Sequence, residues 1–142
     1  MEKNIEQIFE MMKVKKVNPR MYSPLTLAFI GDSVYDLIIR TKVVTNANAP
    51  VNKLHREASK YVKASAQAAM ILKLQDSLTE EELAVYKRGR NAKSGTVPKN
   101  AKLIDYKNAT GYEALVGYLY LKGQLARIFE LVNEGLDGFE ES

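Results

Sequence analysis

The chain has 142 residues, of which 46% are hydrophobic and 27% are charged, and its formal net charge is +4 at pH 7; this composition is typical of one folded domain rather than of a disordered protein. No cysteine is present, which excludes disulfides, zinc–thiolate sites and cysteine nucleophiles. Charged residues or glycine interrupt each apolar run before the ~18 residues that a membrane span needs, and the N-terminus lacks the apolar core of a signal peptide, so we expect a cytoplasmic protein without membrane contact.

Helical periodicity begins close to the N-terminus. An amphipathic helix is predicted there by the spacing of Ile5, Ile8, Phe9 and Met12. Ser23 followed by Pro24 predicts the N-cap and first position of a second helix, which ends near Val43. The buried stripe of this second helix is expected to contain Leu25, Ala28, Tyr35 and Ile39.

The middle of the chain is also helical. A helix is expected from Pro50, with a bend or restart at Ser65 before Leu74, and its inward residues are Leu54, Ala58 and Tyr61. Thr79 and Glu82 form a capping-box pattern that opens a short helix, for which we predict an end at Gly89.

The C-terminal third begins with a loop. Residues 90–98 contain glycine and proline and show no apolar period, so we expect a loop there. A helix over 108–121 ends at Gly123, and a last helix with Gly135 as terminator is predicted from Leu125, Ile128, Phe129 and Val132. No segment shows the alternating apolar and polar pattern of a β-strand. We therefore predict one all-α domain of about seven helices over residues 1–142, with an N-terminal helix and linker at 1–22 and a C-terminal helix and acidic tail at 124–142.

Two of these helices place a carboxylate among apolar and small residues: Asp32 follows Gly31, and Glu113 precedes Gly117. A helical glycine costs ~1 kcal/mol relative to alanine, and a buried carboxylate needs a partner or a metal. If the two helices pack face to face, Asp32 and Glu113 converge on one divalent cation, and their hard oxygens favour magnesium or manganese. The alternative is that each acid is exposed or salt-bridged and that the glycines are ordinary packing positions.

Other polar and aromatic residues have two interpretations each. Asp36 lies one turn after Asp32 and is a possible auxiliary ligand, or else forms an i,i+4 pair with Arg40. The single histidine, His55, is expected to be a surface or packing residue rather than an RNA contact or an acid/base group. Packing in the core or in an interface, rather than base stacking, is expected for Tyr35, Tyr112, Tyr118 and Tyr120.

A basic segment precedes the penultimate helix. Its candidate RNA-binding residues are Lys87, Arg88, Arg90, Asn91, Lys93 and Ser94, which are the residue types that bind phosphates and ribose hydroxyls. A solvated charged loop is the alternative.

Three motifs in order resemble the ribonuclease III family. The Leu-Gly-Asp-Ser/Ala-Val signature is similar to 29–34, the Lys-Ser-Gly loop to 93–95, and the Glu-Ala-Leu-Ile-Gly motif to 113–117. Segments 23–32 and 88–94 resemble the short branch called Mini-ribonuclease III, which lacks the double-stranded-RNA-binding domain. Two carboxylates of the longer enzymes are missing, because Ala28 and Thr110 stand in their places.

The resemblance implies an endoribonuclease that cuts double-stranded RNA as a homodimer. Asp32 and Glu113 would hold Mg²⁺, with Mn²⁺ as a substitute, and the basic segment would bind the duplex. The implied substrate is the precursor of large-subunit ribosomal RNA, and ribosomal proteins are candidate partners. Two other readings stay open: a non-catalytic RNA-binding or ribosome-associated protein on the same scaffold, and a helical protein-interaction module, which would leave the basic segment unexplained.

Overall fold

The structure is a computed structural model and describes residues 2–93 and 102–139. Within these residues the chain forms helices and no β-strand, so the predicted all-α fold is confirmed. The described α-helices are α1 (Glu2–Met12), α2 (Pro24–Asn46), α3 (Val51–Val62), α4 (Ala64–Leu74), α5 (Glu80–Asn91), α6 (Leu103–Leu121) and α7 (Leu125–Leu136), and the short 3-10 helices are η1 (Pro19–Met21) and η2 (Gln75–Ser77). None of the described helices is long and apolar enough to cross a lipid bilayer.

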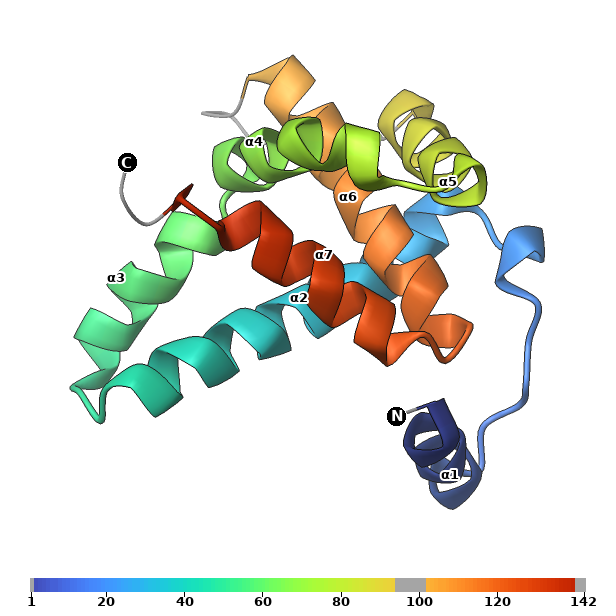
Figure 1. The fold of residues 1–142 in the computed structure, drawn as a ribbon, viewed down its shortest axis with the longest axis horizontal. Coiled ribbons are helices and arrows are strands. Elements are labelled where there is room, and N and C mark those ends of the chain that lie inside the picture. The colour runs from blue at the N-terminus through green and yellow to red at the C-terminus, as the bar shows by residue number, and fades with distance from the viewer. Residues whose placement is uncertain (1, 94–101, 140–142) are drawn as a thin grey trace.

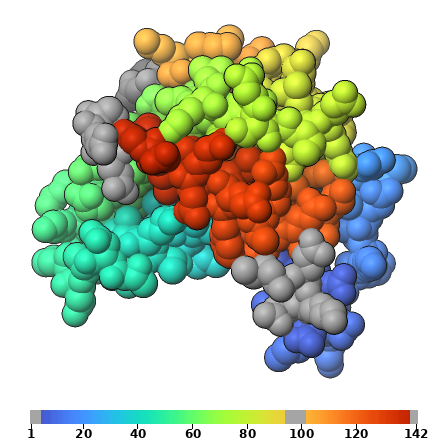
Figure 2. Space-filling view, in the orientation of Figure 1, coloured from blue at the N-terminus to red at the C-terminus, as the bar shows by residue number. Residues whose placement is uncertain are grey.

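Helix α6 runs through the centre of the molecule, where it packs against α2, α4, α5 and α7 (Figure 1). In the space-filling view α7 covers much of the front face (Figure 2). Each residue of α6 from 108 to 119 is buried, with the single exception of Glu113. The fold therefore encloses the middle of this helix and leaves the carboxyl group of Glu113 at the edge of the buried stretch.

The predicted helix starts are confirmed where the signal is local. The Ser23 hydroxyl accepts a hydrogen bond from the Thr26 amide at 3.2 Å, and Pro24 follows in the first turn. The capping box is complete, because the Glu82 amide donates to the Thr79 hydroxyl and the Glu82 carboxylate accepts from the Thr79 amide, at 3.1 and 3.0 Å. These bonds satisfy amides that have no partner within the helix.

Two glycines that were predicted to end helices lie inside them instead. Gly89 is within α5, where an added Cβ would be only 2.8 Å from the Cα of Gly111 in α6. Gly135 is within α7 and faces Met70 of α4. Both serve close helix packing, so these two predictions are wrong. The third, Gly123, does end α6 with a φ of +80°, a conformation that glycine adopts without strain.

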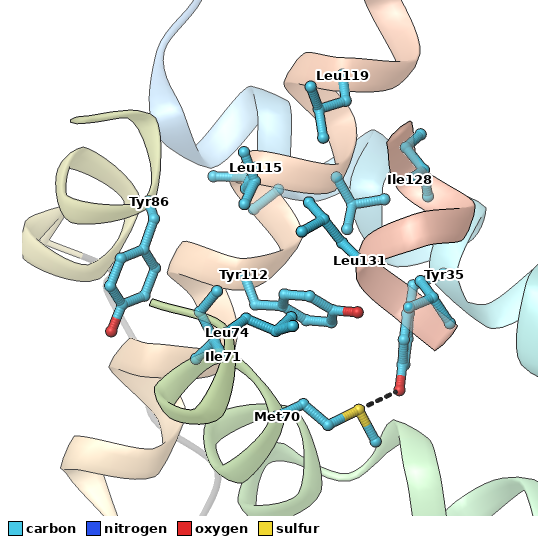
Figure 3. Packing of buried hydrophobic residues seen from close by; sticks show 14 of the residues in the cluster. Tyr35, Met70, Ile71, Leu74, Tyr86, Tyr112, Leu115, Leu119, Ile128 and Leu131 are labelled. Carbon is cyan, nitrogen blue, oxygen red and sulfur yellow. Dashed lines mark hydrogen bonds between the residues drawn. The ribbon is translucent and has the colours of Figure 1, made fainter. Parts of the chain in front are cut away.

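The core is built around tyrosines, as predicted. Tyr35 and Tyr112 are fully buried and meet edge to face, with ring centroids 5.2 Å apart, and the Tyr35 hydroxyl lies 3.2 Å from the Met70 sulfur (Figure 3). The predicted stripe of α2 needs one correction. Leu25 is 39% exposed, while Leu27 is completely buried.

Two helix bounds differ from the prediction. Helix α2 continues to Asn46, and α6 begins at Leu103 rather than near 108. In α1, Ile5 is buried, but Ile8 and Met12 are exposed. The apolar face predicted for this N-terminal helix is therefore only partly covered by the rest of the described chain.

Candidate active site

Helices α2 and α6 touch through their backbones at two glycines. The position of a Cβ on Gly31 is occupied by backbone atoms of Glu113, and a Cβ on Gly117 would lie 1.9 Å from the carbonyl oxygen of Leu27. A side chain at either position would separate the helices. Because Asp32 follows Gly31 directly, this close crossing places Asp32 beside Glu113.

The two carboxyl groups share one electrostatic environment. Asp32 is exposed and Glu113 is partly buried. Burial, followed by the hydrogen bond and the negative charge of Asp32, raises the pKa of Glu113 to about 9. Two like charges held together beside apolar atoms repel each other, and either a proton or a cation relieves that repulsion. The structure thus brings the two predicted ligands together, while their catalytic role stays a prediction.

A third polar side chain at this site was not predicted. Gln67 of α4 is 2% exposed, and its Nε2 donates to the carbonyl oxygen of Val62 at 2.8 Å. A hydrogen bond from the Gln67 amide lowers the pKa of Glu113, whereas burial and the neighbouring Asp32 raise it by more. Its Oε1 is buried and has no hydrogen-bond partner among the described residues. The only sequence signal is one glutamine within the apolar segment 64–72.

Buried aromatic residues lie next to the acidic pair. The Tyr35 hydroxyl donates to the carbonyl oxygen of Tyr61 at 2.7 Å, and burial, with a smaller contribution from the charge of Glu113, raises the pKa of Tyr35. Tyr35 therefore stays protonated. Its ring packs against the interior side of the site, and its protonated hydroxyl does not act as a base.

The remaining candidate acid is engaged elsewhere. Asp36 forms an ion pair with Arg40 of the same helix, with Oδ2 and Nε 3.0 Å apart. This i,i+4 pair is the alternative to metal binding that the sequence left open. Ala28 is buried, and the Thr110 hydroxyl donates to the carbonyl oxygen of Tyr106 at 2.9 Å. In residues 2–93 and 102–139, no three His, Cys, Asp or Glu side chains gather into a metal-binding cluster.

This donor set fits a small hard cation that keeps much of its water. Magnesium needs only one or two protein carboxylates, since water and substrate phosphate complete its octahedron. Asp32 and Glu113 supply these carboxylates. Gln67, which hydrogen-bonds to Glu113, adds a buried amide oxygen that has no partner among the described residues.

Two basic side chains of α5 contact neighbouring residues. Arg88 is anchored, because its Nη2 donates to the carbonyl oxygen of Tyr22 at 3.2 Å. Arg90 lies 5.6 Å from the centre of the Tyr86 ring and donates to Asn91 Oδ1 at 3.2 Å.

The other predicted RNA contacts surround the end of the same helix. His55 of α3 is exposed. Lys87 and Lys93 are exposed as well, while Ser94 lies outside the described residues. Helix α5 ends at Asn91, so these cations are at or just beyond its C-terminus. Their position is suited to contact with an anionic surface.

Comparison with known proteins identifies relatives along most of the chain. The family model for the ribonuclease III domain matches residues 25–124. A protein named Mini-ribonuclease 3 from Thermoanaerobacter sp. (strain X514) is 52% identical over 119 residues, which cover 84% of each chain. One of the same name from Brevibacillus brevis is 50% identical over 117 residues, covering 82% of this chain and 87% of the relative.

A solved structure shares the fold. The crystal structure of a Fusobacterium nucleatum protein aligns with a TM-score of 0.77 at 32% identity, over 84% of this chain and 95% of the other. The resemblance inferred from the three sequence motifs is therefore confirmed.

Proposed function

We propose that this chain, which belongs to the ribonuclease III family and is an endoribonuclease, hydrolyses phosphodiester bonds of duplex RNA at a divalent cation held by Asp32 and Glu113. The observation that carries the proposal is the convergence of these two carboxyl groups where α2 and α6 cross. Two carboxylates at the edge of a buried helix repel each other, and a cation that binds both offsets that repulsion.

The residues act by holding charge at a fixed place. A divalent cation such as Mg²⁺, or Mn²⁺ in its place, supplies Lewis acidity that eases deprotonation of water and offsets the negative charge of the phosphate. Asp32 faces solvent and is accessible to the RNA backbone, while Glu113 is fixed by α6. Tyr35 and Tyr112 close the interior side against water. No protein nucleophile is required.

Duplex RNA is the substrate class that the surface favours. A-form RNA hides its base edges in a deep major groove, so recognition depends on phosphates and shape. Arg90 and Lys93 are suited to phosphate contact, and Lys87 extends the same surface. We further propose, from the resemblance carried by the sequence motifs, a cytoplasmic role in maturing the precursor of large-subunit ribosomal RNA, with ribosomal proteins as candidate partners.

A homodimer is the proposed working form. Helix α2 carries an exposed apolar stripe in which Leu25 is 39%, Phe29 80% and Leu37 67% exposed, with Ser33 between the last two. Large apolar side chains clustered on a surface mark an interaction site, and a two-fold contact through one helix is self-complementary. The dimer supplies two acidic sites, one for each strand.

The test is single-turnover cleavage of a labelled duplex in Mg²⁺, beside a gel-shift titration. Asp32→Asn and Glu113→Gln keep the side-chain shape but remove the charge, so each should abolish or greatly slow cleavage while duplex binding persists. Asp36→Asn is the matched control and should have a small effect, because its Arg40 pair is worth only a few tenths of a kcal/mol.

Two results contradict the proposal in different ways. Cleavage by both variants at the wild-type rate would show that Asp32 and Glu113 do not form a shared metal site. Duplex binding without cleavage by the wild-type protein, in both Mg²⁺ and Mn²⁺, would favour the non-catalytic RNA-binding protein.

A further inference from the structure

We propose that Gln67 is a positioning residue of this active site: its side-chain amide holds the Glu113 carboxyl group in the orientation that receives the cation. The inference rests on the proposed function, since it takes Glu113 as a metal ligand. It assigns to α4 a direct role in a site that otherwise belongs to α2 and α6.

The amide of Gln67 is fixed before any ligand arrives. One of its two N–H groups is used by the carbonyl oxygen of Val62, the last residue of α3, at 2.8 Å. The side chain is 2% exposed, so packing leaves it little rotamer freedom. A primary amide has a second N–H. Helix α4 packs against α6, and a hydrogen bond from Gln67 lowers the pKa of Glu113. The glutamine thus links the α3–α4 junction to the metal ligand.

The remaining polar atom of this amide points to a ligand-related role. Gln67 Oε1 is buried without a hydrogen-bond partner in the described part of the chain, and an unpaired buried acceptor destabilises a fold. The neighbouring residues Ala66, Ala68 and Ile71 show that this stretch of α4 is otherwise apolar. An aliphatic residue would fill the same space without that penalty. A hydrated cation carries water donors that such an oxygen can accept.

The experiment measures Mn²⁺ binding to the full chain without RNA, by electron paramagnetic resonance of the free ion. We compare wild type with Asp32→Asn, Glu113→Gln, Gln67→Met and the double variant of Gln67→Met with Glu113→Gln. Gln75→Met on η2 is the control. Loss of a residue that orients a metal ligand typically weakens metal binding by ~10-fold or more, which we expect for Gln67→Met. In the Glu113→Gln background Gln67→Met should cause no further loss. The control should bind as wild type.

The outcomes separate this inference from the proposed function. If Gln67→Met binds Mn²⁺ like wild type, or weakens it equally in the Glu113→Gln background, the positioning role is overturned. If Glu113→Gln and Asp32→Asn also bind like wild type, the proposed metal site fails first. Thermal melting verifies the fold of each variant. If Gln67→Met does not fold, Gln67→Asn replaces it and is judged by the same criteria, because its side chain is too short to reach both Val62 and Glu113.

Discussion

Gly31 lies so close to Glu113 that a Cβ on the glycine would be 1.8 Å from the carbonyl oxygen of the glutamate. Real side chains do not tolerate such an approach, so α2 and α6 can cross here only because Gly31 has none. The same contact sets the separation of Asp32 and Glu113. Packing and chemistry therefore depend on one glycine.

Gly31→Ala should consequently damage both stability and metal binding. Overpacking of a close contact costs about 1–3 kcal/mol, and more where backbone must move. We expect a clear fall in Tm by circular dichroism, together with weaker Mn²⁺ binding, as the helices separate. Gly135→Ala is the control, because its Cβ would meet side chains alone, Met70 at 3.3 Å and Leu74 at 3.5 Å, and no backbone atom. If Gly31→Ala melts like Gly135→Ala, the inferred backbone contact is wrong.

Glu113 gives the metal-free protein an unusual pH dependence. The folded protein keeps this proton up to pH about 9, while the unfolded chain loses it near the ordinary glutamate pKa of ~4.3. The folded state therefore binds more protons between these values, and stability falls as the pH rises through that window.

Glu113→Gln should remove this loss. At pH 8 in EDTA we expect its Tm to exceed that of wild type by several degrees, since ~1 kcal/mol shifts Tm by about 2–4 °C in a domain somewhat larger than this one. Mg²⁺ should raise the Tm of wild type more than that of the variant, because it binds the folded site. Equal melting curves in EDTA at pH 5 and pH 8 for wild type and variant would contradict the shifted pKa.

Local signals predicted more of this fold than packing-dependent ones. Ser23 and Thr79 each bind an amide three residues away, so their caps were readable from the sequence. Glycine was ambiguous, because Gly123 ends a helix through its positive φ whereas Gly89 lets α5 approach α6. The meeting of Asp32 and Glu113 was inferred as a hypothesis from small neighbours. Gln67 was missed, since nothing in its own segment shows that α4 packs beside Glu113.

The basic residues near the end of α5 should contribute to RNA affinity rather than to chemistry. Arg90→Ala with Lys93→Ala should weaken duplex binding and flatten its salt dependence, by up to ~0.9 log units for each phosphate that is no longer neutralised. Cleavage at saturating RNA should change little. Arg88 is left intact in this variant, because its bond to the Tyr22 carbonyl gives it a structural role.

A charge-matched control makes that result specific. Lys13→Ala with Lys15→Ala removes the same charge from the linker after α1. Fluorescence anisotropy over a salt series should show the smaller slope for the α5 variant alone. An equal change in both variants would indicate an effect of net charge rather than of RNA binding at α5.

Phe29 should hold the proposed dimer together. It is 80% exposed on α2, three residues from Asp32, and a large aromatic side chain in water loses the free energy that burial in an interface provides. Phe29→Glu places a charge in that contact, so we expect a dimer for wild type and a monomer for the variant by sedimentation velocity at micromolar concentration. Met11→Glu on α1, a site that is 82% exposed, should leave the dimer intact.

The products should report the same difference. A dimer presents two acidic sites to one duplex and cuts both strands in one encounter, whereas a monomer cuts one strand and dissociates. Wild type should therefore release short duplexes on a native gel, while Phe29→Glu should accumulate nicked RNA that is visible only after denaturation. A wild-type protein that sediments as a fully active monomer, or a Phe29→Glu variant that stays dimeric, would show that the exposed stripe of α2 is not the subunit interface.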